Sequence, residues 1–157
     1  MDLDAAKAQL LKQLAWEIRD KRVVEAMRRV PRERFVPEAQ RPFAYDDRPL
    51  GIGYGQTISQ PFIVAMMVQA LELTPESKVL EVGSGSGYVS AILGELAQQV
   101  VGVEIVPELA DYAAATIQDL GYTNVDIHLV SKSTLGYMPG APYDAILVSA
   151  GAPTVPA

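Results

Sequence analysis

The stretch that decides the fold is Lys78-Val79-Leu80-Glu81-Val82-Gly83-Ser84-Gly85-Ser86-Gly87-Tyr88. Its first part, Val79 to Val82, is a short apolar run that predicts a buried strand, and glycines at alternating positions follow it. The apolar stretch Ala91 to Leu96 then predicts a helix. A strand, a glycine turn and a helix place free backbone N–H groups at a helix N-terminus, where a polar or anionic ligand can bind.

The glycine spacing separates two kinds of nucleotide site. Gly83, Gly85 and Gly87 give G-x-G-x-G, whereas the dinucleotide fingerprint needs G-x-G-x-x-G, and position 88 is tyrosine. Glu81 stands two places before the first glycine. The resulting pattern, E-x-G-x-G-x-G, resembles the nucleotide-binding motif of S-adenosylmethionine-dependent methyltransferases. The motif by itself leaves two alternatives open, a site for an NAD-type cofactor and a purely structural tight turn.

The composition excludes several classes of site. The chain has 157 residues, enough for one domain with a core but not for two. There is no cysteine and His128 is the only histidine, which excludes disulfides, Cys-ligated metals and a multi-histidine metal site. A Ser-His-Asp triad would need His128, for which its apolar surroundings predict no catalytic role. We therefore expect no metal, and His128, in an apolar stretch, is expected to be a strand residue.

The charge and hydropathy pattern also limits the partners. The chain carries 13 basic and 19 acidic residues, which disfavours nonspecific binding to nucleic acids or anionic membranes. The N-terminus is charged and amphipathic, and no apolar run approaches membrane-spanning length. We expect a cytoplasmic protein that binds neither nucleic acid nor membrane.

The order of the elements predicts an α/β fold. We expect one domain over residues 1–157, in which 1–60 form a helical extension and an active-site loop and 61–157 form a cofactor-binding half-sheet. Strands that alternate with helices imply a parallel, Rossmann-like sheet with helices on both faces, whose ligands bind at the carboxyl ends of the strands. The predicted strands are Lys78–Val82, Val100–Ile105, Val125–Val130 and Tyr143–Ser149; the predicted helices are 4–19, 21–29, Phe62–Leu71, Tyr88–Ala97 and Glu108–Leu120.

Two further features fit a ligand site. The glycine-rich stretch Pro42 to Gln60 predicts a loop that can approach a ligand closely, although a plain surface connection would have a similar composition. Glu104 ends the second predicted strand about 20 positions after Gly83, where an acidic residue can grip the two hydroxyls of a ribose. The alternative for Glu104 is a solvent-facing residue that caps the next turn.

Longer blocks resemble one family across essentially the whole chain. They are Arg22–Met27, Val30–Pro37, Gly53-Tyr54-Gly55-Gln56-Thr57-Ile58-Ser59-Gln60-Pro61, Glu81–Tyr88 and Ala141–Ile146, and all are similar to protein-L-isoaspartate O-methyltransferases. The resemblance implies transfer of a methyl group from S-adenosylmethionine to the carboxylate of isoaspartyl residues in damaged proteins or peptides. Ionised carboxylates need no general base, so catalysis reduces to aligning the reacting atoms and excluding water.

The resemblance also implies roles for particular residues. Ser59 is the expected active-site hydroxyl, within a loop over the cofactor, and Glu104 is expected to hold the ribose. Gly83, Ser84 and Gly85 are expected to line the amino-acid end of the cofactor. The full set of expected cofactor-binding residues is Thr57, Ile58, Ser59, Gln60, Glu81, Gly83, Ser84, Gly85, Gly87 and Glu104.

Two departures from the family pattern bear on activity. The family usually has Gly-Asp-Gly after the third strand, with the Asp reaching the adenine amino group, whereas this chain has Ser131-Lys132-Ser133. Because lysine cannot accept a hydrogen bond, we expect weaker cofactor binding, by about 1–3 kcal/mol. The family also continues beyond Gly151–Ala157 through a helix and further strands, so we expect C-terminal strands to be missing. The strand 143–149 would then be an uncovered edge that invites self-association.

These departures leave alternative functions open. The chain is either a fragment or a shortened homologue, and a shortened homologue could be a weak or inactive protein that acts as a cofactor-binding or interaction module. A third alternative keeps methyl transfer but with a small-molecule acceptor. The intact Thr57-Ile58-Ser59 block favours the isoaspartyl methyltransferase, whereas Ser131-Lys132-Ser133 and the C-terminal strands expected to be missing favour the module.

Overall fold

A computed structural model describes residues 2–134 and 136–151 of the chain. The tail from 152 to 157 lies outside the described residues. The helices are α1 (Leu3–Glu17), α2 (Lys21–Arg29), α3 (Pro61–Ala70), α4 (Tyr88–Leu96) and α5 (Pro107–Asp119), with 3-10 turns η1 (Arg32–Phe35), η2 (Glu38–Phe43) and η3 (Met138–Gly140). The strands are β1 (Leu50–Gly53), β2 (Gln56–Ile58), β3 (Lys78–Val82), β4 (Gln99–Glu104), β5 (Val125–Leu129) and β6 (Ala145–Val148).

The main sheet has four parallel strands in the order β5-β4-β3-β6. Val82 at the end of β3 pairs with Val103 on one side and with Val148 on the other. The carboxyl ends of β3, β4 and β6 therefore meet at one edge of the sheet, where the glycine turn begins. This arrangement confirms the predicted α/β fold with a parallel, Rossmann-like sheet.

The two faces of the sheet are covered differently. Val79, Val100 and Leu147 point into the main core, which also contains the buried residues of α3, α4 and α5. On the opposite face, Leu80, Val101 and Val103 pack against residues of the segment between β5 and β6, such as Tyr137 and Tyr143. The described helices thus lie on one face and a loop covers much of the other, which corrects the prediction of helices on both faces. The edge strand β6 leaves Ile146 and Val148 55% and 56% exposed.

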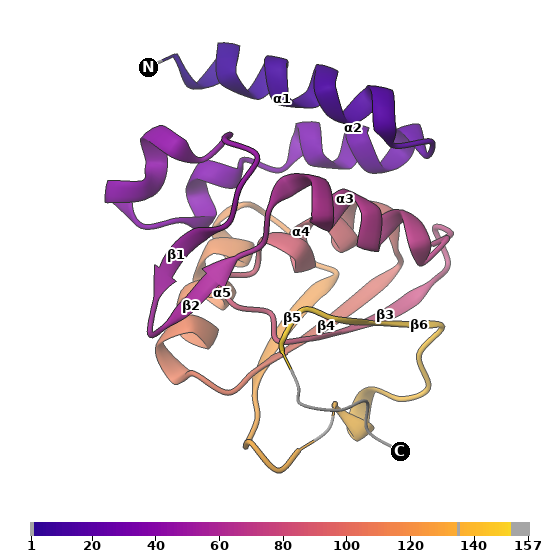
Figure 1. Cartoon of the computed structure of the whole chain (residues 1–157). Coiled ribbons are helices and arrows are strands. Elements are labelled where there is room, and N and C mark those ends of the chain that lie inside the picture. Colours follow the sequence, from indigo (N-terminus) through magenta and orange to yellow (C-terminus); the bar gives the residue numbers. More distant parts are fainter. Residues whose placement is uncertain (1, 135, 152–157) are drawn as a thin grey trace.

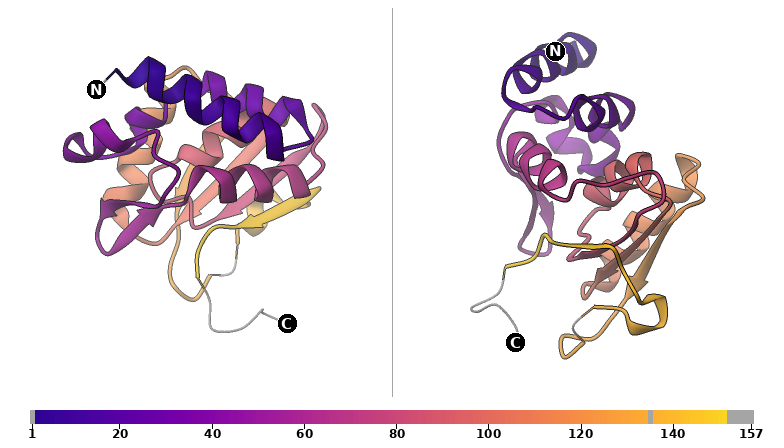
Figure 2. Two further views of the ribbon diagram at one scale, coloured as in Figure 1. Left: turned by 45° about the horizontal axis from the view of Figure 1, so that its top comes forward. Right: turned by 90° about the vertical axis from the view of Figure 1, so that its right-hand side faces the viewer.

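The N-terminal helices form a separate layer above α3 (Figure 1). Each begins at an aspartate: the Asp2 side chain accepts from Asp4 N and Ala5 N, and Asp20 accepts from Arg22 N as expected for a helix cap. Leu14 of α1 and Met27 of α2 are buried in the main core. Figure 2 shows this layer at the end of the molecule opposite the turn that precedes β6. Within the described ranges, no helix has both the length and the apolar character needed to cross a membrane.

The glycine-rich stretch expected to be a loop instead contains an antiparallel hairpin. Leu50 of β1 pairs with Ile58 of β2, and Gly51 pairs with Thr57. Its tip, Gly53-Tyr54-Gly55, has φ angles of 89°, 56° and 70°, a left-handed conformation that glycine adopts without strain. Leu50 and Ile58 are buried, which fixes the hairpin on the body of the protein beside α5 (Figure 1).

Candidate functional site

The glycine turn follows β3 at the carboxyl edge of the sheet. The N–H groups of Gly83 and Ser84 both donate to the carbonyl of Val103, at 2.9 and 3.0 Å, and so fasten the turn to β4. Gly83 has a φ of 85°, and a Cβ at this position would lie 2.6 Å from the Cβ of Ala150. Only glycine fits here, because the chain after β6 passes directly over the turn.

Glu104 ends β4 and lies against the same turn. Its carboxylate accepts hydrogen bonds from the backbone N–H of Gly85 at 2.7 Å, of Ile105 at 2.8 Å and of Val106 at 3.1 Å. The residue is only 6% exposed, so the alternative of a solvent-facing Glu104 is wrong, although the carboxylate does cap the following turn. The structure thus brings Glu104 and Gly85 together, as the spacing predicted.

The hairpin lies over the glycine turn, and together they line a small cavity of about 30 Å³. Thr57, Ile58 and Ser59 line it from the hairpin side; we call these three residues the lid. Buried within its wall, the Ser84 hydroxyl has no hydrogen-bond partner in the described part of the chain. A buried hydroxyl of this kind is unusual unless it serves a ligand or water. The remaining wall consists of Ile52, Glu81, Gly83, Ser84, Gly85, Ser86, Tyr88, Val89 and Ser149; Glu104 touches Gly85 but is not part of the wall.

Glu81 is a buried acid in the floor of this cavity. Ser90 Oγ donates to Glu81 Oε1 at 2.5 Å and Ser149 Oγ donates to Oε2 at 2.7 Å, and the residue is 1% exposed. Burial raises the pKa of the Glu81 carboxyl to about 7, because the charged form loses its hydration. The two serines oppose this rise, and the nearby Glu104 carboxylate adds to it.

Besides Glu104, two expected cofactor residues lie outside the cavity wall. Gln60 precedes α3, and its carbonyl accepts from Val64 N at 3.0 Å as part of the first helical turn. Gly87 lies at the start of α4 with a φ of 94°, where a Cβ would come within 3.1 Å of the Ala113 Cβ on α5. The geometry therefore gives both residues a structural position, and a cofactor contact for either stays a prediction.

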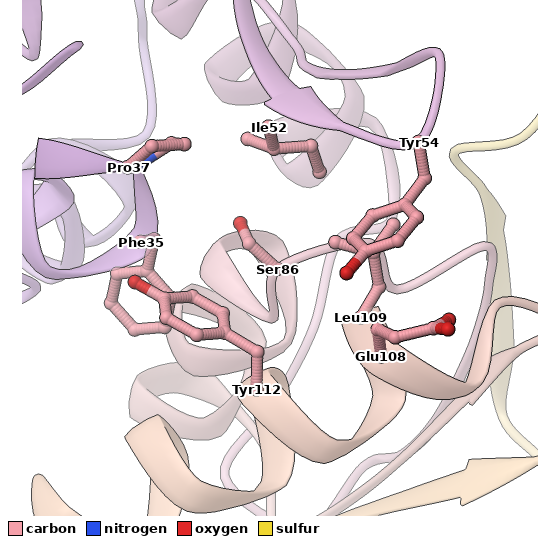
Figure 3. A pocket seen from close by; sticks show the side chains of 8 residues that line it. All are labelled: Phe35, Pro37, Ile52, Tyr54, Ser86, Glu108, Leu109 and Tyr112. Carbon is pink, nitrogen blue, oxygen red and sulfur yellow. The ribbon is translucent and has the colours of Figure 1, made fainter. Parts of the chain in front are cut away.

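A second, larger cavity of about 290 Å³ adjoins the first (Figure 3). The two share Ile52 and Ser86 in their walls. Side chains of the hairpin face those of α5 across it, and Phe35 and Pro37 close one side (Figure 3). The complete lining is Phe35, Pro37, Ile52, Tyr54, Ser86, Glu108, Leu109 and Tyr112.

Sequence reasoning missed three residues that shape the site. Ser149 follows β6 and reaches Glu81 across the sheet, and the rule that ligand groups gather at strand ends could have found it. Ser90 faces the same carboxylate from α4. Arg32 lies in the block Val30–Pro37, and its guanidinium is fully buried and donates to the carbonyl of Ser59 at 3.0 Å.

The sequence of this chain also matches the model of one protein family. Residues 5–157 match the model of the family described as Protein-L-isoaspartate(D-aspartate) O-methyltransferase (PCMT). The chain belongs to this family. The resemblance noted in the sequence blocks is thereby confirmed over nearly the full chain.

Individual members of the isoaspartate methyltransferase family are similar in sequence. The protein-L-isoaspartate O-methyltransferase of Roseiflexus sp. (strain RS-1) is 56% identical over 140 residues, which cover 89% of this chain and 64% of the relative. That of Protochlamydia amoebophila (strain UWE25) is 54% identical over 139 residues, covering 88% and 66%. The chain thus spans just under two thirds of the length of these relatives.

Solved structures of the family share the fold. One protein-L-isoaspartate O-methyltransferase has a TM-score of 0.81 and 27% identity, over 92% of this chain and 48% of that chain. A putative member from Plasmodium falciparum, in complex with S-adenosyl-L-homocysteine, has a TM-score of 0.80 and 28% identity, over 94% of this chain and 75% of that one.

Proposed function

We propose that this chain carries the cofactor and lid portion of a protein-L-isoaspartate (D-aspartate) O-methyltransferase, which methylates isoaspartyl carboxylates in damaged proteins with S-adenosylmethionine as donor. The single observation that supports it most is the closure of the lid over the glycine turn, with Glu104 bound to Gly85 N at 2.7 Å. Family membership and the relative solved with S-adenosyl-L-homocysteine support the same donor.

The groups around the cavity suit a cationic nucleoside ligand. Glu81 and Glu104 bring two carboxyl groups to the turn, and a positively charged sulfonium is favoured near negative charge. The Ser84 hydroxyl has bonding capacity left, and Glu104 has one acceptor site left for a ribose hydroxyl. S-adenosylmethionine, when bound, supplies an electrophilic methyl group on its sulfonium.

The chain's own residues then have a limited chemical task. The acceptor carboxylate is ionised near neutral pH, so its oxygen forms the new bond to the methyl carbon as the carbon–sulfur bond breaks, without proton transfer. We assign Ser59, half-buried in the lid, to hydrogen-bond the acceptor carboxylate or the donor. Alignment and exclusion of water supply most of the rate.

The tip of the hairpin has to move for ligands to enter the small cavity. The cavity of about 30 Å³ has room for about one water molecule, whereas ligand pockets generally measure about 300–1,000 Å³. The positive-φ residues Gly53 and Gly55 at the hairpin tip allow such a movement. We assign the adjoining cavity of about 290 Å³ to a part of the acceptor peptide next to the isoaspartyl residue.

One experiment in two steps tests the proposal. Calorimetry with S-adenosylhomocysteine is followed by an assay of methyl ester formation, read as methanol released, on an isoaspartyl peptide and on its aspartyl twin. We expect one ligand per chain and methanol from the isoaspartyl peptide alone. Binding without turnover would leave a cofactor-binding module, and no binding would overturn both enzyme hypotheses.

Replacing Lys132 by aspartate is expected to tighten binding of S-adenosylhomocysteine about tenfold. Lys132 is exposed after β5, at the position where the family pattern has an acidic residue that accepts from the adenine amino group. One restored hydrogen bond is worth about 1–2 kcal/mol, which is roughly tenfold in the dissociation constant. Calorimetry on the two proteins measures it, with Lys132→Asn as a control for loss of charge. Equal affinities of all three would show that this segment does not contact the adenine.

A further inference from the structure

Arg32 is a buried cation behind the lid. It is 0% exposed, and in the described part of the chain it forms no ion pair with a carboxylate. Instead its Nε donates to the carbonyl of Ala44 at 2.8 Å, and its Nη2 donates to the carbonyl of Ser59 at 3.0 Å. Nη2 also points to the carbonyl of Arg48 at the longer distance of 3.5 Å.

The two acceptors of Nη2 lie at the two ends of the hairpin. Arg48 precedes β1 and Ser59 follows β2, so a single guanidinium nitrogen bridges the base of the hairpin that carries the lid. The guanidinium carbon also lies 4.8 Å from the centre of the Tyr88 ring. Tyr88 directly follows the glycine turn and belongs to the wall of the small cavity.

We propose that Arg32 is a positioning residue, which sets the lid residue Ser59 over the glycine turn by tying the base of the hairpin to the start of α4. The inference rests on the proposed function for its catalytic consequence. Arg32 does not belong to the wall of either cavity, so it acts through Ser59 and Tyr88.

A contribution to stability alone does not explain an arginine at this buried position. A buried guanidinium without a carboxylate partner is unfavourable, and burial lowers the pKa of Arg32 for the same reason. A planar fork can bind several carbonyls in fixed directions while it stacks on an aromatic ring, which a lysine ammonium cannot do. What this arrangement provides is a fixed distance between the hairpin base and the turn.

The proposal predicts a local effect of Arg32→Lys, a variant that keeps the charge and loses the fork. We expect amide hydrogen exchange over residues 50–59 to become about tenfold faster, with exchange in β3 and β4 unchanged. Arg28→Lys is the matched control, because Arg28 is exposed on α2 and bonds only to Glu25 among the described residues. The exchange measurement needs no cofactor, so it tests the role of Arg32 even if the chain fails to bind S-adenosylhomocysteine.

A second readout separates positioning from simple stabilisation. In the active protein, Arg32→Lys should lower kcat for the isoaspartyl peptide about tenfold and change its KM by less than twofold. When Arg32→Lys is combined with Tyr88→Leu, the effect on hydrogen exchange in the hairpin should be smaller than the sum of the effects of the two single variants. Faster exchange throughout the sheet would mean that Arg32 only stabilises the fold. Unchanged exchange in the hairpin would overturn the proposal directly.

Discussion

Replacing Glu104 by alanine is expected to weaken S-adenosylhomocysteine binding about 10- to 100-fold. The N–H groups of Gly85, Ile105 and Val106 position the carboxylate and occupy three of its lone-pair sites, which leaves one on Oε2 for a ribose hydroxyl. A hydrogen bond to a charged group contributes about 1.5–3 kcal/mol, so losing it corresponds to roughly one to two orders of magnitude in the dissociation constant. Calorimetry at constant pH and salt measures the change.

Two comparison variants make the Glu104 result specific. Glu104→Gln keeps the shape and one acceptor oxygen, so its affinity should lie between those of the wild type and the alanine variant. Glu76→Ala removes an exposed acid outside the site and should leave affinity unchanged. If Glu104→Ala bound the ligand as tightly as Glu76→Ala does, the ribose assignment would be wrong.

The free energy of unfolding of Glu81→Gln, relative to that of the wild type, is expected to be about 2–3 kcal/mol higher at pH 8 than at pH 5. The pKa of Glu81 rises from 4.5 to about 7 on folding, so the folded protein holds this proton more tightly than the unfolded chain does. Its stabilising contribution is fully present below pH 4.5 and is lost as pH rises through about 7. Each pKa unit corresponds to about 1.4 kcal/mol, which sets the size of the effect.

Urea unfolding of wild type and Glu81→Gln at pH 5, 6, 7 and 8 tests this prediction. The stability difference between the two should grow with pH, and the largest change should fall between pH 5 and 7. Glu76→Gln, at an exposed position, should follow the wild type throughout. A stability difference that stayed constant over this range would show that Glu81 is ionised in the folded protein across all of it.

The sheet could be predicted from the sequence because its signals are local. The apolar run of β3 ends at three alternating glycines, and the predicted strand Lys78–Val82 matches the observed one. The same local reading placed α2 at Lys21–Arg29. Glu104 was found from its distance along the chain to Gly83, since a strand, a turn, a helix and a second strand have nearly fixed lengths.

The hairpin and the buried polar groups could not be predicted in this way. The stretch from Leu50 to Ile58 has the glycine content of a loop, and it becomes a hairpin because Leu50 and Ile58 are buried against the body of the protein. The Ser149–Glu81 bond joins residues 68 positions apart, and no local pattern marks it. Arg32 stands in the charged run Arg32-Glu33-Arg34, which gives no local sign of burial, and arginine is rarely buried without a carboxylate partner.

The most direct test of the central claim is a titration of the isotope-labelled protein with S-adenosylhomocysteine, followed through the backbone amide signals in NMR spectra. We predict saturable shifts at Ser59 in the lid, at Gly85 in the turn and at Ile105 beside Glu104, all with one dissociation constant. Such a result would place the lid, the glycine turn and Glu104 around the same ligand. Shifts confined to another part of the chain, or none at saturating ligand, would contradict it.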